Sequence, residues 1–235
     1  MVHKKTDNVE EFPERDIMKQ LSNFQNTETI QIVAPGLLGK DHYVRLNPDL
    51  LTIVVNKAIE IDIKKDVWIT CDMKQAVACE WFKQGIADHA DIACILAGAF
   101  ARMYPDAKWV FGFGPLQKAG IHFAEPLEGF LRYGTTVTGC ALQLAYWLGA
   151  KRIILCGVDF QGDKYFDGTS RGVPVSQLTK RIAPRMNRLI AWMINKGVRI
   201  ETLSKTYLRL SDPKVTISRR KNGRGVSLLD LAKDL

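Results

Sequence analysis

The sequence predicts an α/β domain of the doubly wound type, in which helices cover both faces of a mostly parallel sheet. Seven apolar runs of strand length recur along the chain, each bounded by Gly, Pro, Asp or Asn. The runs lack clean alternation of apolar and polar residues, which is typical of parallel strands covered on both faces. Helical patterns fill several of the gaps, and strand, helix, strand alternation is the signature of a Rossmann-like sheet.

The predicted elements follow one another in a regular order. Strands are expected over residues 30–34, 51–55, 67–71, 92–96, 109–113, 153–156 and 198–202, and helices over residues 73–83, 138–148 and 177–196. The helix over 138–148 is the best defined, because Thr136 precedes it as a cap and Gly149 follows it as a stop. It leads directly into the sixth strand.

Length and composition predict one large domain with two polar extensions. The chain has 235 residues, 46% hydrophobic and 25% charged, which excludes wholesale disorder. We predict a polar N-terminal arm over 1–26, a Rossmann-like domain over 27–210 and a basic tail over 211–235. No apolar run approaches the roughly 20 residues that span a bilayer, and the five cysteines lack CxxC spacing, so we expect a cytoplasmic protein with reduced thiols.

The formal net charge of +8 predicts an anionic partner. Nucleotides, acidic sugars, nucleic acid and membrane surfaces all meet that description. Much of the excess lies in the last third of the chain, in Lys180, Arg181, Arg185 and Arg188 and in the tail. Solvated helix faces are the alternative interpretation of the same residues.

The loop after the first predicted strand is a candidate phosphate site. In an open α/β sheet the ligand lies beyond the carboxyl ends of the strands. Pro35 and Gly36 follow the first strand, where Gly36 would let backbone amides approach a phosphate and Lys40 would add a counter-charge. Neither GxxxxGK[ST] nor GxGxxG occurs, which argues against a P-loop ATPase or an NAD enzyme. An ordinary Pro-Gly turn is the alternative.

Two further groups of polar residues fall at predicted strand and helix ends. Thr136 and Thr138 begin a helix, where their hydroxyls and the helix dipole would hold an anion, although N-capping explains one of them equally well.

Asp72 and Asp159 follow apolar strands, where a carboxylate without a role would be costly. They are candidates for binding a ribose hydroxyl or Mg²⁺, or, for Asp72, for capping the next helix.

The histidines do not predict a metal centre. His3, His42, His89 and His122 have none of the paired spacings of zinc sites. The absence of GxSxG likewise removes support for a Ser-His-Asp hydrolase. No cofactor is therefore predicted with the main interpretation.

Residues 136–160, TVTGCALQLAYWLGAKRIILCGVDF, carry a family resemblance. The segment resembles the single-domain bacterial sialyltransferases and the related domain shared by Maf-type flagellin glycosyltransferases and archaeal hydroxymethylpterin diphosphokinase-like proteins. The specific part is the pattern AxxLGxKxIxLxGxDF. Residues 32–36 and 54–58 resemble the first loop and the strand ending in a nucleotide-contacting Asn of the same families, so the similarity covers roughly residues 28–208.

The resemblance implies a set of ligand contacts. Gly36, Asn56, Asp72, Thr136, Thr138 and Asp159 would surround a nucleotide, together with Pro35 and Gly157 in the loops. The sialyltransferases have a catalytic histidine in the loop after GxDF and a Gly-Pro-Ser first loop, whereas no histidine follows His122 here and the loop reads Ala-Pro-Gly. These departures argue against sialyl transfer specifically. Tyr165 in the loop 161–174 remains able to orient a leaving phosphate.

The combined prediction is a nucleotide-dependent transferase, a glycosyltransferase that moves a sugar from a nucleotide-sugar to a hydroxyl. Asp159 and Tyr165 are the catalytic candidates, and loop 161–174 is expected to act as a lid. The first alternative is Mg²⁺-dependent diphosphoryl transfer to a small pterin-like alcohol, with Asp72 and Asp159 as metal ligands. The second is a non-enzymatic nucleic-acid-binding protein that uses the basic tail. The sequence leaves open a glycan acceptor and a homo-oligomer.

Overall fold

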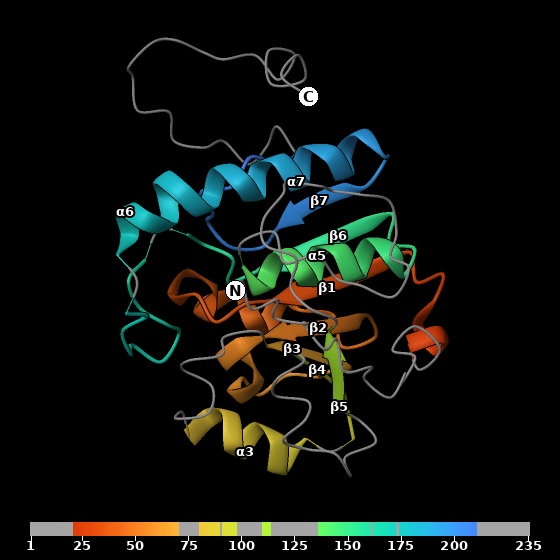
Figure 1. Ribbon diagram of the computed structural model, residues 1–235, viewed down its shortest axis with the longest axis horizontal. Helices are drawn as coiled ribbons and strands as arrows, with labels where there is room; N and C mark the ends of the chain where they lie inside the picture. The colour runs from red at the N-terminus through yellow and green to blue at the C-terminus, as the bar shows by residue number, and fades with distance from the viewer. Residues whose placement is uncertain are drawn as a thin grey trace, which may run out of the picture.

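A seven-stranded parallel sheet forms the centre of the molecule (Figure 1). The computed structural model describes residues 21–70, 80–89, 91–97, 110–113, 136–160, 162–172 and 174–210. The strands are β1 (Thr29–Val33), β2 (Leu51–Val55), β3 (Val67–Thr70), β4 (Ala93–Ala97), β5 (Val110–Phe113), β6 (Arg152–Cys156) and β7 (Arg199–Thr202). Their order is β5-β4-β3-β2-β1-β6-β7. The predicted α/β class and all seven strands are confirmed.

The strand order contains one reversal of direction, next to β1. From β1 to β5 each new strand adds to the same side of the sheet, and the chain then crosses back so that β6 and β7 add to the other side. In the register, Ile32 of β1 pairs with Ile53 of β2 and with Leu155 of β6. Ligands of open α/β sheets bind at such a topological switch point, outside the carboxyl ends of the flanking strands. The carboxyl ends of β1 and β6 are therefore the expected place for a site.

The strands are apolar because the sheet is covered on both faces. All residues of β2 and β3 are buried. Trp68 of β3 packs against Phe82 with ring centroids 5.7 Å apart, and both side chains are almost completely buried. Such burial is worth roughly 1.5 to 3 kcal/mol for each large side chain.

The helices occupy the two faces in the way that right-handed crossovers require. They are η1 (Leu21–Phe24), η2 (Leu37–Arg45), η3 (Asn56–Glu60), α3 (Glu80–Asp88), α5 (Val137–Trp147), α6 (Val175–Gln177), the π-helical η4 (Leu178–Ile182) and α7 (Ala183–Asn195). The connection through α3 moves the chain toward β5, whereas those through α5 and α7 move it toward β7. Right-handed connections then place α3 on one face and α5 and α7 on the other. Figure 1 shows α5 and α7 together, with α3 apart from them.

Two predicted helices differ from the observed ones. Most of the helix expected over 73–83 lies outside the described residues, and the described helix α3 continues past residue 83 to Asp88. It runs through Gly85 because that glycine lets Trp68 and Ile59 pack close: a Cβ there would lie 3.0 Å from the Trp68 ring. The helix expected over 177–196 is divided by the π turn of η4. Residues 1–20 and 211–235 lie outside the described residues, so the arm and tail boundaries stay predictions.

The described helices include none that is both long and apolar enough to cross a bilayer.

Candidate functional site

The loops that follow β1 and β6 interlock through glycines. Gly36 donates its amide to the Gly157 carbonyl at 3.0 Å. A Cβ on Gly36 would lie 2.2 Å from that carbonyl oxygen, and a Cβ on Gly157, whose φ is +71°, would lie 2.0 Å from the Ala34 oxygen. The two predicted site residues Gly36 and Gly157 are thus in direct contact, at the switch point of the sheet.

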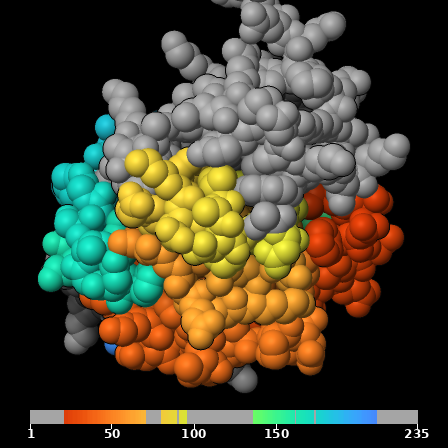
Figure 2. Space-filling view, turned by 90° about the horizontal axis from the view of Figure 1, so that it is seen from below, coloured from red at the N-terminus to blue at the C-terminus, as the bar shows by residue number. Residues whose placement is uncertain are grey.

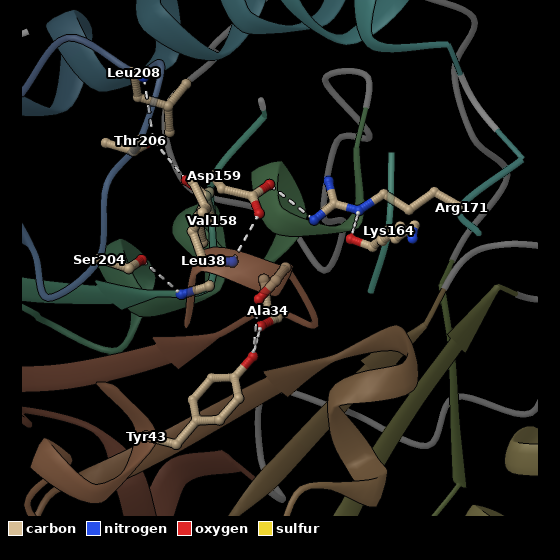
Figure 3. Close-up of polar contacts among 12 residues, drawn as sticks. Ala34, Leu38, Tyr43, Val158, Asp159, Lys164, Arg171, Ser204, Thr206 and Leu208 are labelled. Carbon is tan, nitrogen blue, oxygen red and sulfur yellow. Dashed lines mark hydrogen bonds and ion pairs between the residues drawn. The ribbon is translucent and has the colours of Figure 1, made fainter. Parts of the chain in front are cut away.

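A buried ion pair lies beside this contact (Figure 3). The Asp159 side chain is 0% exposed, and its Oδ1 accepts a hydrogen bond from Arg171 Nη2 at 2.8 Å. Its Oδ2 accepts from the Leu38 amide at 3.4 Å, and a Cβ on Gly36 would come within 2.6 Å of the same oxygen. A buried carboxylate needs such partners. Asp159 therefore joins the loop after β1 to Arg171.

The segment that follows β7 supports the loop after β6 from behind. Ser204 Oγ accepts from the Gly157 amide at 3.0 Å, and Thr206 donates its hydroxyl to the Val158 carbonyl. The Tyr207 amide donates to the Asp159 carbonyl at 3.0 Å. Figure 3 shows Ser204 and Thr206 approaching the loop on the side away from Arg171. These bonds fix the backbone that carries the Asp159 carboxylate.

Tyr43 of η2 supports the first loop from below. Its hydroxyl donates to the Ala34 carbonyl at 3.0 Å and lies 3.3 Å from the Gly36 carbonyl. Burial, with a contribution from nearby Cys156, raises the pKa of the Tyr43 phenol, so the hydroxyl stays a donor. Burial likewise raises the pKa of the Cys156 thiol to about 12. The thiol is therefore protonated and unreactive at neutral pH.

Residues 162–172, here named the strap, cover the first loop. Lys164 and Ser170 form an antiparallel bridge within the strap, and Tyr165 forms another with Gly36. The Phe166 amide donates to the Pro35 carbonyl at 2.9 Å. In Figure 2 the blue-green region that includes the strap lies directly against the orange surface to which η3 belongs. The predicted lid segment therefore rests on the Pro35-Gly36 loop in this structure.

Lys57 of η3 fastens the tip of the strap. Its Nζ lies 2.5 Å from Asp167 Oδ2 and 3.7 Å from a carboxylate oxygen of Glu60. Partial burial acts to raise the pKa of Asp167, but the hydrogen bonds from Lys57 and Thr169 outweigh it and lower that pKa to about 2. The same pairing outweighs burial at Lys57 and raises the pKa of its ammonium. The contact is an ion pair at neutral pH.

Tyr165 lies between two cations. Lys57 Nζ is 5.8 Å from the centroid of the Tyr165 ring, and the Arg171 guanidinium carbon is 5.6 Å from it. Cations over an aromatic face are attracted by the ring quadrupole. The strap thus brings one phenol and the Arg171 guanidinium to the edge where Gly36 lies, and Lys57 of η3 adds a second positive charge there.

Asn56 occupies the carboxyl end of β2, as predicted. It has a positive φ of 48°, and its Oδ1 accepts a hydrogen bond from Thr70 at 3.0 Å. That bond orients the side-chain amide, whose Nδ2 has no hydrogen-bond partner among the described residues. Asn56 can therefore present two N–H donors to a ligand.

Thr136 and Thr138 lie at the same edge of the sheet. Helix α5 leads directly into β6, so its first turn lies at the carboxyl ends of the strands. Thr136 Oγ1 accepts from the Gly139 amide at 3.1 Å and caps the helix. It also donates to Met186 Sδ of α7. Thr138 is buried in the first turn. The N-cap is thus present, and anion binding by these threonines stays a prediction.

Two other predicted site residues, Lys40 and Asp72, have different outcomes. Lys40 is exposed on η2, four residues after Gly36. Asp72 lies outside the described residues, so its place beside Asp159 is untested. The described ranges contain no cluster of three or more metal-ligating side chains, and Asp159 is paired with Arg171.

Arg171, Tyr43 and Lys57 are not among the site residues that the sequence predicts. The sequence does place Lys57 near the site, because it follows Asn56 at the end of a predicted strand. Arg171 lies between glycines in a long loop, and no spacing in the sequence connects it with Asp159.

The fold matches the sialyltransferase CstII from Campylobacter jejuni, solved with the substrate analogue CMP-3FNeuAc, with a TM-score of 0.52 and 12% identity over 88% of this chain and 98% of that one. This chain has the fold of a bacterial sialyltransferase. The monofunctional α-2,3-sialyltransferase Cst-I from the same organism has a TM-score of 0.49 and 15% identity, covering 89% of this chain and 93% of the other. No protein-family model and no curated protein sequence matches the chain.

Proposed function

We propose that this protein is a glycosyltransferase that moves a sugar from a nucleotide-sugar to a hydroxyl acceptor. The observation that carries the proposal is the direct contact of Gly36 with Asp159 and Gly157 at the switch point between β1 and β6. That is the place where open α/β sheets bind nucleotides. The shared fold with CstII, which was solved with a CMP-sugar analogue, supports the same substrate class.

In the proposed reaction, the bond between the sugar carbon and a phosphate oxygen of the nucleotide breaks while the acceptor oxygen bonds to that carbon, and the acceptor hydroxyl gives its proton to a base or to the departing phosphate. Negative charge then builds on the departing phosphate, so donors fixed in advance at that point stabilise the transition state more than the ground state. Tyr165, held between Lys57 and Arg171, supplies such a donor beside two cations. Asn56 supplies amide donors for the nucleoside.

In this arrangement Asp159 acts as a positioning residue. Its carboxylate is fully buried, and it holds Arg171 and the Leu38 amide in place. As a catalytic candidate, Asp159 could instead take the acceptor proton as a base, but its side chain would then have to leave the ion pair. The base assignment therefore stays a prediction, as do the anion contacts of Thr136, Thr138 and Lys40.

Nucleotide binding tests the proposal directly. We would measure the melting temperature of the full chain with CMP, UDP, GDP and ATP and with the matching nucleotide-sugars, with and without Mg²⁺. At a ligand concentration 100 times the Kd, binding stabilises the native state by about 2.7 kcal/mol. A chain stabilised by none of these ligands would contradict the proposal.

A matched pair of glycine variants locates the binding. Gly36→Ala places a Cβ within 2.8 Å of Gly157, Asp159 and Arg171 atoms, whereas a Cβ on Gly162 meets nothing closer than 3.8 Å. We expect Gly36→Ala to lose nucleotide binding, with affinity lowered at least about tenfold, and Gly162→Ala to keep it. Circular dichroism checks that Gly36→Ala is folded. A folded Gly36→Ala variant with unchanged affinity would place the nucleotide elsewhere.

A further inference from the structure

Residues 174–210 carry almost all of the net charge of the chain. This stretch contains eight Lys or Arg residues and one acidic residue, Glu201, so it accounts for +7 of the net +8. Glu201 is already paired with Arg152 and Arg199 on β6 and β7. From Val175 to Asn195 the helical segment has four cations and no acidic residue. The excess is therefore local and uncompensated within the segment.

The helical cations form one exposed stripe. Arg181, Arg185 and Arg188 have the i, i+4, i+7 spacing that places side chains on one side of a helix, and Lys180 adjoins them. All four are exposed. None forms an ion pair with another described residue, whereas most cations near the candidate site do. Arginines kept side by side without acids repel one another, so the arrangement has a cost that a bound anion would remove.

The stripe begins at the same edge of the sheet as the candidate site. Helix α7 leads directly into β7, so α6, η4 and the first turns of α7 lie at the carboxyl ends of the strands, as Figure 1 shows. The segment after β7 connects the two regions. The Tyr207 amide bonds to the Asp159 carbonyl at 3.0 Å, and the Arg209 amide bonds to Asn187 Oδ1 of α7 at 2.8 Å.

Lys205 and Arg209 extend the stripe from the helix toward the site. Both are exposed and alternate with the buried residues Ser204, Thr206 and Leu208. We name the resulting surface the basic face; its members are Lys180, Arg181, Arg185, Arg188, Lys205 and Arg209. It leads from the outer side of α7 to the backbone beside Asp159.

We propose that the basic face binds an acceptor glycan that carries several carboxylate or phosphate groups and guides it to the candidate site. This inference rests on the proposed glycosyl transfer, and it adds that the acceptor is anionic. A chain of anionic groups would contact successive cations along the face while its terminal hydroxyl reaches the edge near Asp159. Electrostatic complementarity of this kind raises the association rate and selects against neutral acceptors.

The composition of the face favours a glycan over the other polyanions. Single-stranded nucleic acid is held by several aromatic side chains on which bases stack. Membrane-surface helices bury an apolar face in the lipid. In the described part of the chain Tyr207, which is 47% exposed, is the one well-exposed aromatic residue, and Pro184 is the one exposed apolar residue from Val175 to Asn195. A hydrophilic polyanion needs neither feature.

Binding measurements on the full chain test the proposal. The probes are a fluorescent oligogalacturonate, a neutral malto-oligosaccharide of equal length, a single-stranded oligonucleotide, and phosphatidylcholine vesicles with and without phosphatidylglycerol. The test variant is Arg185→Gln/Arg188→Gln. The matched control is Lys83→Gln/Lys151→Gln, which removes two exposed cations elsewhere. We expect the wild type to bind oligogalacturonate, the test variant to bind it about tenfold more weakly, and the control to be unchanged.

The other outcomes overturn the proposal. It fails if the neutral oligosaccharide binds equally well, or if both double variants lose affinity equally. It fails in favour of a nucleic acid or a membrane if those probes bind more tightly and lose binding in the test variant alone. Nucleotide binding, measured with CMP, UDP, GDP and ATP on the same three proteins, should be the same in all. Absence of binding of all four nucleotides to the wild type would count against the proposed function, whereas absence of glycan binding alone would count against the basic face only.

Discussion

The two side chains of the Asp159–Arg171 pair differ in burial, and this difference decides how much stability is lost when either one is replaced. The Asp159 side chain is 0% exposed, whereas that of Arg171 is 13% exposed. A charge left alone in the interior is costly because water cannot solvate it, while a partly exposed guanidinium still reaches solvent. Removing the arginine should therefore harm the protein more than neutralising the acid.

Arg171→Gln should lower the free energy of unfolding by about 3 to 5 kcal/mol, since it leaves a buried carboxylate unpaired. Asp159→Asn should cost less, because the amide oxygen can still accept from Leu38 and the guanidinium is not fully enclosed. Urea denaturation at neutral pH measures both. The double variant should be more stable than the sum of the single losses predicts, because the two groups interact directly. Strict additivity would show that the pair contributes no coupling.

At the scale of elements, the strap is held by the Phe166–Pro35 backbone bond, the Tyr165–Gly36 bridge and the Arg171–Asp159 ion pair, and its tip is held by polar contacts. The tip is fastened by Lys57 to Asp167, and Asp167 Oδ1 accepts from the Thr169 amide at 3.0 Å. A tip held by such contacts opens locally at a lower free energy than the core strands. The Lys57–Asp167 ion pair therefore contributes to how firmly the tip of the strap is held.

The Thr169 amide should report the ionisation of Asp167. The pKa of Asp167 in the folded protein is about 2, below the ordinary value of 3.8. The Lys57–Asp167 ion pair therefore stabilises the strap above pH 4, and this stabilisation is lost as the pH falls toward 2. In NMR titrations the wild-type amide should show no transition above about pH 3. Lys57→Gln should move the transition up toward the ordinary value, and the control Lys83→Gln should not. Identical titrations in all three proteins would show that Lys57 does not hold Asp167.

How far the sequence predicts an element depends on whether its determinants are local. Helix α5 has its cap at Thr136 and its stop at Gly149 within the segment itself, so the prediction is confirmed to within one residue. Helix α3 continues past its predicted end because Gly85 packs against Trp68, a contact between distant parts of the chain. Arg171 escaped prediction for the same reason, since its role depends on a carboxylate in another loop.

The whole sheet shows the same division between local and distant determinants. Each strand is an apolar run, which a single sequence reveals, but the placement of β6 beside β1 depends on pairing across more than a hundred residues. That pairing brings Gly36 and Asp159 together, as the family resemblance implied and no spacing could show. Contacts that join distant segments must overcome the entropy of closing long loops, so they are decided by the fold as a whole.

Gly157 should determine how closely β1 and β6 approach each other at their carboxyl ends. Its φ is +71°, and a Cβ would lie 2.0 Å from the Ala34 oxygen, so Gly157→Ala forces β1 and β6 apart at their carboxyl ends. Gly197 has a similar φ of +88° but open space around its Cβ position. Gly197→Ala therefore measures backbone strain alone, about 1 to 2 kcal/mol.

Gly157→Ala should cost clearly more than that control, with a loss of at least about 3 kcal/mol in the free energy of unfolding. The excess over Gly197→Ala measures the steric conflict between the halves. Urea denaturation, followed by both circular dichroism and tryptophan fluorescence, gives the two values. If Gly157→Ala and Gly197→Ala lowered the free energy of unfolding equally, the close approach of the loops after β1 and β6 would contribute nothing to the stability of the fold. The carboxyl ends of β1 and β6 would then leave room for a ligand without these glycines.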